Sequence, residues 1–115
     1  MKENLLIDKS IILASRIIKL HQYLIKTKKE TIISKQIVRS GTSIGANINE
    51  ANYGQSKADF ISKMHIALKE TGESIYWLTL LKRTGLFEYD YQGLLCIAEE
   101  IKRMLIASLN TAKKK

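Results

Sequence analysis

The sequence of 115 residues contains no proline and a single cysteine, Cys96. Proline is the residue that most often breaks a helix from within, so its absence favours long, uninterrupted helices. One cysteine cannot form a disulfide within the chain, which is typical of the reducing cytosol and predicts a cytoplasmic location. Because Cys96 stands among leucine, isoleucine and alanine residues, we expect it to be a buried, inert thiol.

Long apolar runs are also absent. No stretch approaches the roughly 18 apolar residues needed to cross a bilayer, so no membrane partner is expected. Asp8 and Lys9 interrupt the first apolar stretch, which therefore does not resemble a signal peptide. With 45% hydrophobic and 26% charged residues, the composition is that of a soluble globular protein, and the length predicts one domain.

The residue patterns of catalytic and metal sites are missing as well. Neither His21 nor His65 has a glutamate three positions before it, as a di-iron helix bundle requires. The chain has no Cys-x-x-Cys or His-Glu-x-x-His motif, and its glycine-rich segment lacks the Lys-Ser/Thr of a phosphate-binding loop. We therefore predict no enzymatic activity, no metal and no cofactor, and expect His21 to be a buried or interface histidine with a hydrogen-bond partner.

What the sequence does contain is a repeat of apolar residues at intervals of three and four, which predicts helices. Four helices are expected, at about residues 5–27, 35–53, 57–84 and 91–109. Their short connections make successive helices antiparallel. The predicted fold is therefore all-α, an up-down-up-down antiparallel four-helix bundle of residues 1–112, followed by a basic tail at residues 113–115 into which the last helix frays.

The ends of these helices carry recognisable signals. Ser34, Ser56 and Asp90 are expected to cap the second, third and fourth helices, because their side chains can accept hydrogen bonds from free N–H groups of the first turn. Gly54 and Gly85 fit the left-handed position that follows a helix.

The first helix has two apolar stripes. The first stripe contains Ile7, Ile11, Ala14, Ile18, His21 and Ile25, and the second contains Leu13, Ile17, Leu20 and Leu24. One stripe is enough for packing inside a small bundle. Two stripes therefore predict a helix that is buried on two sides, the second time against another subunit.

The segment Val38–Gly54, VRSGTSIGANINEANYG, combines small and polar residues with a helical rhythm of apolar ones. A glycine inside a helix costs about 1 kcal/mol relative to alanine. Gly41 and Gly45 lie one turn apart, so they predict that a neighbouring helix approaches closely at this point.

Polar side chains of the same segment are expected to hold the helices together. Asn47 and Glu50 lie near apolar positions, and if partly buried they need hydrogen-bond partners on the third helix. The candidate partners are Glu73, Tyr76 and Trp77. The predicted structural anchors are Ser43, Asn47, Glu50 and Glu73.

The formal net charge of +8 is unevenly distributed. Residues 1–56 contain nine Lys and Arg against four Asp and Glu, residues 57–112 contain seven of each, and residues 113–115 are all lysine. This distribution favours contacts with the phosphates of RNA or DNA, whereas the small number of aromatic residues argues against base stacking. The candidate contact residues are Arg16, Lys19, Lys26, Lys28, Lys29, Lys35, Arg39, Lys113, Lys114 and Lys115.

Residues 33–51, ISKQIVRSGTSIGANINEA, resemble the hallmark Q-L-R-R-A-x-x-S-I-x-A-N-I-A-E-G of the 23S rRNA intervening-sequence protein family. The matching residues are Gln36, Arg39, Ser43, Ile44, Ala46, Asn47, Ile48 and Glu50. In the third predicted helix, the residues in register with the family are Asp59, Phe60, Ala67, Glu73 and Leu78. Val38 and Gln55 stand where the family often has arginine, and Ala51 replaces a usual glycine.

The resemblance implies a four-helix bundle that assembles as a homopentamer. It also implies kinship with the accessory variability protein of diversity-generating retroelements, a basic pentamer that binds nucleic acid and a reverse transcriptase. Our leading hypothesis is a non-enzymatic oligomer that binds RNA, such as rRNA, or other nucleic acid. The alternative is a scaffold or accessory subunit that docks an acidic protein partner, such as a polymerase, without contacting nucleic acid.

Overall fold

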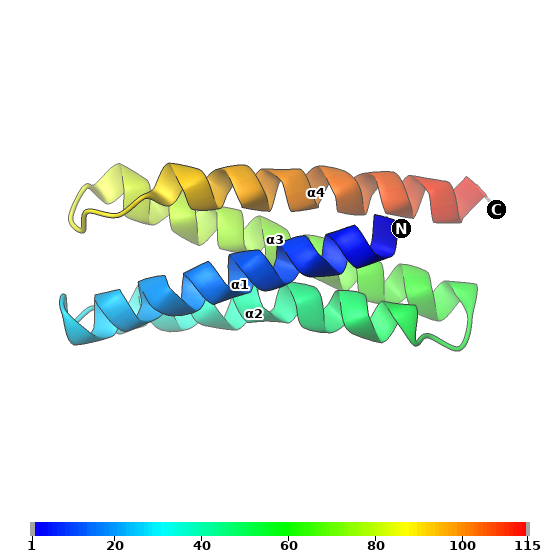
Figure 1. Ribbon diagram of the computed structural model, residues 1–115, viewed down its shortest axis with the longest axis horizontal. Coiled ribbons are helices and arrows are strands. Elements are labelled where there is room, and N and C mark those ends of the chain that lie inside the picture. The colour runs from blue at the N-terminus through cyan, green and yellow to red at the C-terminus, as the bar shows by residue number, and fades with distance from the viewer. Residues whose placement is uncertain (1, 115) are drawn as a thin grey trace.

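Four helices make up most of the structure, a computed structural model that describes residues 2–114 and the side chains of residues 5–114. Their bounds are α1 Lys2–Lys26, α2 Ile32–Asn52, α3 Lys57–Thr84 and α4 Tyr91–Lys114. The helices lie side by side and form a rod of 47 × 20 × 20 Å (Figure 1). The predicted all-α four-helix bundle is confirmed.

Each helix runs antiparallel to the next and packs against it, and α4 returns to lie along α1 (Figure 1). The packing of α2 against α3 is the most extensive, and that of α1 against α4 is the least. The α1–α2 turn and the α3–α4 loop share one end of the rod, whereas the α2–α3 loop and the C-terminus of α4 share the other. This arrangement decides which surface residues become neighbours.

Helix α2 is capped by Glu30, and the cap predicted at Ser34 is wrong. The Glu30 carboxylate accepts hydrogen bonds from the N–H groups of Ile32, Ile33 and Ser34 at 3.0, 3.0 and 2.8 Å. Ser34 already lies inside the helix, where its side chain is fully buried. The longer acidic side chain replaces a serine cap because it satisfies three free N–H groups, and its charge suits the positive end of the helix dipole.

The caps predicted for α3 and α4 are confirmed. Ser56 Oγ accepts a hydrogen bond from the Asp59 N–H at 3.0 Å, and Asp90 Oδ1 accepts one from the Gly93 N–H at 3.0 Å. Gly85 follows α3 in the left-handed conformation with φ of 65°. These local signals fix where both helices begin and where α3 ends.

Two expectations about helix ends are wrong. Gly54 is not left-handed: within residues 2–114 the positive φ values belong to Lys29 and Gly85. Helix α2 ends instead in a tighter turn, since the N–H groups of Tyr53 and Gly54 bind carbonyls three residues back at 3.1 and 3.0 Å. Helix α4 does not fray at residue 111 but continues to Lys114, because alanine and lysine favour the helical state.

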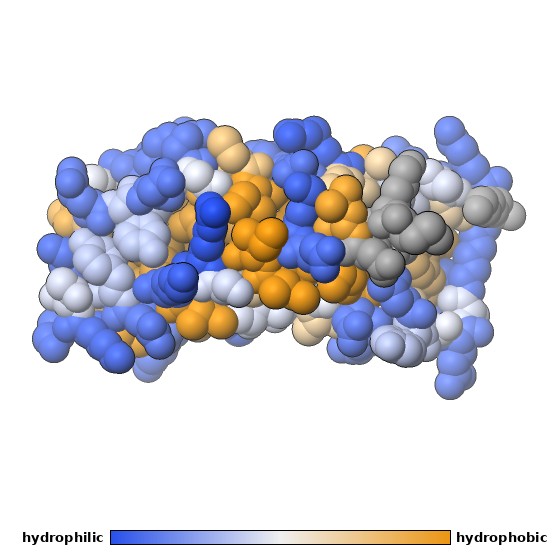
Figure 2. Space-filling model, viewed as in Figure 1, coloured by the Kyte–Doolittle hydropathy of each residue, from blue (hydrophilic) through white to orange (hydrophobic). Residues whose placement is uncertain are grey.

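Helix α1 buries the second of its apolar stripes in the core of the bundle. The fully buried residues of this stripe are Leu13, Ile17, Leu20 and Leu24. In the first stripe, Ile11 is 56% exposed and Ile18 is 41% exposed. Figure 2 shows apolar surface in the middle of the face that α1 crosses in Figure 1. A single chain therefore leaves part of the first stripe exposed, at Ile11 and Ile18.

The predicted close approach at Gly41 and Gly45 is confirmed, and the neighbour is α1. A Cβ atom at Gly41 would lie 2.5 Å from Cδ1 and 3.0 Å from Cγ2 of Ile17. A Cβ atom at Gly45 would lie 2.7 Å from Ser10 Oγ. Both distances are shorter than van der Waals contact, so a side chain at either position would force Ile17 or Ser10 of α1 to shift.

A buried hydroxyl pair joins α2 to α3. Ser74 Oγ donates to Ser40 Oγ at 3.0 Å, and both side chains are fully buried. Each hydroxyl is also within hydrogen-bond distance of a carbonyl in its own helix, Ile37 O for Ser40 and Glu70 O for Ser74. The two polar groups are thereby satisfied inside the core, as buried polar groups must be.

We expect Gly41→Ala to lower the free energy of unfolding by up to about 2 kcal/mol, because overpacking costs about 1–3 kcal/mol and alanine returns only about 1 kcal/mol of helix propensity. Ile17 is fully buried and has little room to withdraw. Gly72→Ala is the matched control, since a Cβ atom there meets nothing within 4 Å, and it should stabilise by about 1 kcal/mol. Urea denaturation measures both effects, and stabilisation by both substitutions would contradict the close approach.

Candidate nucleic-acid interface

Three exposed lysines stand at the end of the rod where α1 turns into α2. Lys26 is in the last turn of α1, and Lys28 and Lys29 follow in the connection. Within residues 5–114, none of the three forms an ion pair with a carboxylate. We call Lys26, Lys28 and Lys29 the lysine turn. Lys35 is exposed near the start of α2 and extends the basic surface along that helix.

Two further predicted contact residues, Arg16 and Lys19, are exposed on α1. Lys19 and Lys26 are seven positions apart, which is two helical turns, so they lie on the same side of the helix. The basic surface therefore continues from the lysine turn along α1.

The predicted tail residues lie elsewhere. Lys113 and Lys114 are exposed in the last turn of α4, at the opposite end of the rod from the lysine turn (Figure 1). Lys115 lies outside the described residues. In a single chain the two basic groups are separated along the rod, whose longest dimension is 47 Å, and they do not form one patch.

Arg39 is held by acidic residues of α3. Its Nη2 lies 2.8 Å from Glu73 Oε1, and its Nη1 lies 3.5 Å from Glu70 Oε1. Glu70 is nearly buried, with 11% of its side chain exposed. A phosphate that approached Arg39 would meet two carboxylates beside the guanidinium, so the structure does not group Arg39 with the unpaired lysines.

The predicted polar anchors divide into two kinds. Ser43 and Asn47 donate to carbonyls within α2, at 2.6 and 2.8 Å, so the expected cross-helix partner of Asn47 is wrong. Glu50 is exposed but does reach α3, where its Oε1 lies 2.9 Å from Lys63 Nζ. The hydrogen bond to Glu50 is the main reason why the pKa of Lys63 is raised above its usual value.

Three tyrosines from two distant parts of the sequence meet at the same end as the lysine turn. The ring centroids of Tyr23 and Tyr89 are 5.4 Å apart, and those of Tyr89 and Tyr91 are 5.9 Å apart. Lys28 Nζ lies 5.9 Å from the Tyr23 centroid, within range of a cation–π interaction. We call Tyr23, Tyr89 and Tyr91 the tyrosine cluster. A low aromatic content did not indicate this surface, because only the fold brings the three rings together.

The comparisons with known proteins agree with the hallmark in α2. The family model of the 23S rRNA-intervening sequence protein matches residues 2–107. The chain belongs to this family. It is also similar to a solved structure from Bacteroides thetaiotaomicron, a protein with unknown function from the S23 ribosomal protein family. The two share 49% sequence identity over 96% of this chain and 99% of that chain, with a TM-score of 0.91. No curated protein matches the chain.

In this member of the 23S rRNA-intervening sequence protein family, the hallmark residues are divided between the core and the surface of α2. Ile44 and Ile48 are fully buried. Arg39 of the hallmark and Glu73, a family-matched residue of α3, bind each other across the helix interface. The exposed lysines of the lysine turn and of the C-terminal end of α4 lie outside the hallmark, at the two ends of the rod.

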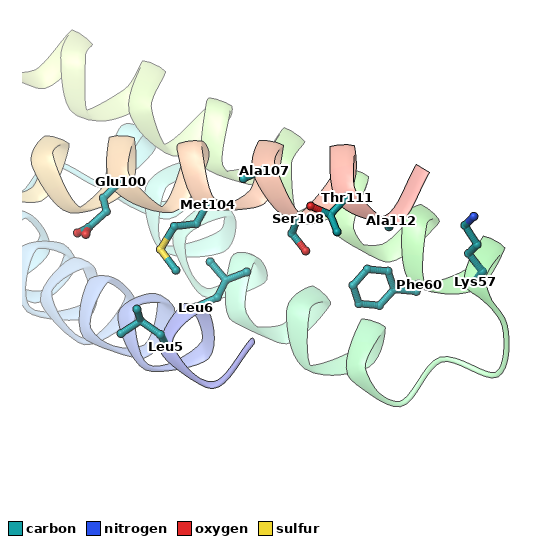
Figure 3. A pocket seen from close by; sticks show the side chains of 10 residues that line it. All are labelled: Leu5, Leu6, Lys57, Phe60, Glu100, Met104, Ala107, Ser108, Thr111 and Ala112. Atoms are coloured by element: carbon teal, nitrogen blue, oxygen red, sulfur yellow. The ribbon is translucent and has the colours of Figure 1, made fainter. Parts of the chain in front are cut away.

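A groove lies between α1, α3 and α4, near the end that carries the C-terminus of α4 (Figure 3). It has a volume of about 640 Å³, and its apolar lining includes Leu5, Leu6, Phe60 and Met104. The groove follows from the limited packing between α1 and α4. Glu100, at one end of the groove, is paired with Lys9 at 3.1 Å, so it is engaged in holding the two helices together.

The remaining candidates for chemistry are a histidine and a cysteine. His21 Nδ1 lies 3.2 Å from the carbonyl oxygen of Ser34, which confirms a hydrogen-bonded interface histidine. Cys96 is exposed, so the predicted burial is wrong: it lies two positions from Leu94 and from Ala98, which puts it on the opposite side of α4 from the core. Among the described residues no group of three His, Cys, Asp or Glu could hold a metal ion, and no helix is long and apolar enough to span a membrane.

Tyr91 is the buried member of the tyrosine cluster. It is buried, its hydroxyl donates to Phe87 O at 2.8 Å, and burial together with Tyr23 and Tyr89 raises its pKa to about 12. Because the folded state keeps this proton more tightly than the unfolded chain, whose phenol has a pKa of about 10, the stabilisation is complete below pH ~10 and is lost as the pH rises towards ~12.

We expect Tyr91→Phe to cost about 1 kcal/mol at neutral pH, through loss of the hydrogen bond. The difference from the parent should shrink as the pH rises above ~10, because phenylalanine cannot ionise. Denaturant unfolding at several pH values between ~8 and ~11 measures this difference. A cost that stays constant over the whole range would contradict a buried, proton-retaining Tyr91, and Tyr53→Phe, at an exposed position, serves as the control.

Proposed function

We propose that this protein is a non-enzymatic RNA-binding protein of the cytoplasm, which forms a homo-oligomer and contacts phosphates through the lysine turn. The single observation that carries the proposal is the lysine turn itself. Its three lysines are exposed, close in the sequence and, within residues 5–114, free of ion pairs. The family description, which refers to intervening sequences of 23S rRNA, makes RNA the first polyanion to test.

The binding surface in this proposal extends from the lysine turn to Lys19, Lys35 and Arg16. Lysine ammonium groups bind phosphates as point charges and release counterions from the nucleic acid. Contacts of this kind position a protein on RNA but carry no sequence information. We therefore expect binding that weakens steeply with salt and discriminates little between sequences of the same shape.

The oligomer in this proposal uses the uncovered stripe of α1. Ile11 and Ile18 are exposed by 56% and 41%, and large exposed apolar patches are typical of protein interfaces. A homopentamer, as the family resemblance implies, would repeat the lysine turn five times. Several copies on one assembly would raise the effective concentration of lysines near a long RNA.

We predict that Lys26→Ala/Lys28→Ala/Lys29→Ala weakens binding to a structured rRNA fragment and reduces the slope of log K against log salt by about 2–3, since each lost phosphate contact removes nearly one unit. The matched control is Lys57→Ala/Lys69→Ala/Arg103→Ala, which removes the same charge from exposed positions of α3 and α4. Gel shifts at ~50 and ~200 mM salt measure both effects.

Two outcomes would contradict the proposal. Failure of the parent protein to retain RNA at ~50 mM salt would exclude electrostatic RNA binding. An equal loss of affinity in the two triple variants would show that net charge matters and that the lysine turn does not.

We further predict that Ile18→Glu lowers the mass of the assembly, because a charge would be placed in the apolar interface and would lose hydration there. Ile106→Glu is the control, since Ile106 is 40% exposed on α4, almost the same as Ile18. Light scattering should give about five times the protomer mass of 13.1 kDa for the parent and for Ile106→Glu. A parent protein that is monomeric at micromolar concentration would overturn the oligomer.

A second candidate function is an accessory subunit that docks a protein partner, such as an acidic region of a polymerase. The observation that favours it lies on α3, where Tyr76 is 59% exposed and packs edge-on against Trp77, with ring centroids 5.0 Å apart. Exposed tyrosine and tryptophan are enriched in the energetically important parts of protein interfaces. This function would be favoured if RNA were not retained at low salt.

A further inference from the structure

We propose that the tyrosine cluster binds one unpaired RNA base, which stacks on the ring of Tyr89 while nearby lysines contact the adjoining phosphates. The inference rests on the proposed RNA binding and assigns it a second kind of contact. It predicts a preference for RNA with a bulge or loop over fully paired RNA, which phosphate contacts alone do not give.

The first support is the position of the Tyr89 ring. Tyr89 belongs to the α3–α4 loop and is 36% exposed. Its ring is held by Tyr23, at 5.4 Å and an interplanar angle of 33°, and by Tyr91, at 5.9 Å and 47°. Because two neighbouring rings already hold Tyr89, little side-chain conformational entropy would be lost when a base stacks on it.

The second support is a hollow beside this ring. It has a volume of about 520 Å³, within the usual range of small-ligand sites. Tyr89, Tyr91 and Phe87 line it together with Lys82, Gly85 and Glu88. A flat base can enter such a hollow only if it has left its own helix. The site therefore suits an unpaired nucleotide.

The third support is the charge around the hollow. Lys82 lines it and donates a hydrogen bond to Gln92, and Lys28 lies over the Tyr23 ring on the other side of the cluster. The acidic groups at this end are Glu30 and Asp90, which cap α2 and α4, and Glu88, which is one of the residues that line the hollow. A carboxylate is an acceptor that suits the amino group of a base.

The experiment compares two RNAs of equal length and equal phosphate number, one a perfect duplex and one with a single unpaired nucleotide. The parent protein should bind the second RNA about tenfold more tightly, which is the scale of one base stacked on an aromatic ring. Tyr89→Ala should lose this preference and keep its affinity for the duplex, whereas Tyr89→Phe should retain both. Tyr53→Ala, at an exposed tyrosine 81% accessible, should behave as the parent.

A second readout locates the contact directly. An RNA that carries 5-iodouridine at the unpaired position should cross-link on irradiation to Tyr89, as identified by mass spectrometry of the digested protein. A cross-link to Tyr53 or Tyr76 in its place would overturn the assignment. Thermal melts of Tyr89→Ala and Tyr89→Phe show whether the loop remains folded.

The outcomes separate this inference from the function on which it rests. If neither RNA binds at ~50 mM salt, RNA binding and base stacking fail together. If both RNAs bind equally and Tyr89→Ala changes neither affinity, base stacking is overturned and phosphate binding stands. If Tyr89→Ala weakens both RNAs to the same extent, the ring serves the structure of the loop, and stacking is again overturned.

Discussion

The contact of Ile17 with the α2 backbone at Gly41 is the constraint on which the rest of the bundle depends. A Cβ atom at Gly41 would lie 2.5 Å from the end of the Ile17 side chain, so the observed packing of Ile17 against α2 depends on the missing side chain. With α1 held there, Leu13 and Leu20 of the same stripe enter the core. Ile18, in the other stripe, faces the solvent. The lysine turn lies at the C-terminal end of α1.

Much of the fold could be predicted from the sequence, because its causes are local or periodic. The spacing of apolar residues identified all four helices, and Ser56 followed by Asp59 marked the start of α3. The same periodicity also contained the correct answer for Cys96, which is out of phase with Leu94 and Ala98 and therefore lies on the outer side of α4. The exposure of Cys96 could have been predicted from its helical spacing, whereas the apolar residues next to it in the chain led to the wrong answer. The Glu30 cap was less accessible, since several polar residues near it could have taken that role.

The candidate site was harder to predict, since it depends on residues that are distant in the chain. The lysines of the α1–α2 turn are adjacent in the sequence and were identified. The ion pair between Arg39 and Glu73 requires the register of α2 against α3, which no local pattern supplies. The meeting of Tyr23 and Tyr89 requires in addition that the α3–α4 loop ends beside the α1–α2 turn. Arg39 therefore joins α2 to α3 on the side of the bundle, whereas the proposed ligand surface lies at its end.

Glu30 changes the electrostatic potential that a ligand would meet at this end. In the net charge of this part of the sequence, the negative charge of Glu30 cancels the charge of one neighbouring lysine. Its two oxygens, however, point at three N–H groups of α2, where the helix dipole places about half a positive elementary charge. The negative charge of Glu30 is thus partly balanced by the backbone, and Lys28 and Lys29 face the solvent with less opposition than the sequence indicates. A helix start can in this way shield a binding surface from the acidic residue beside it.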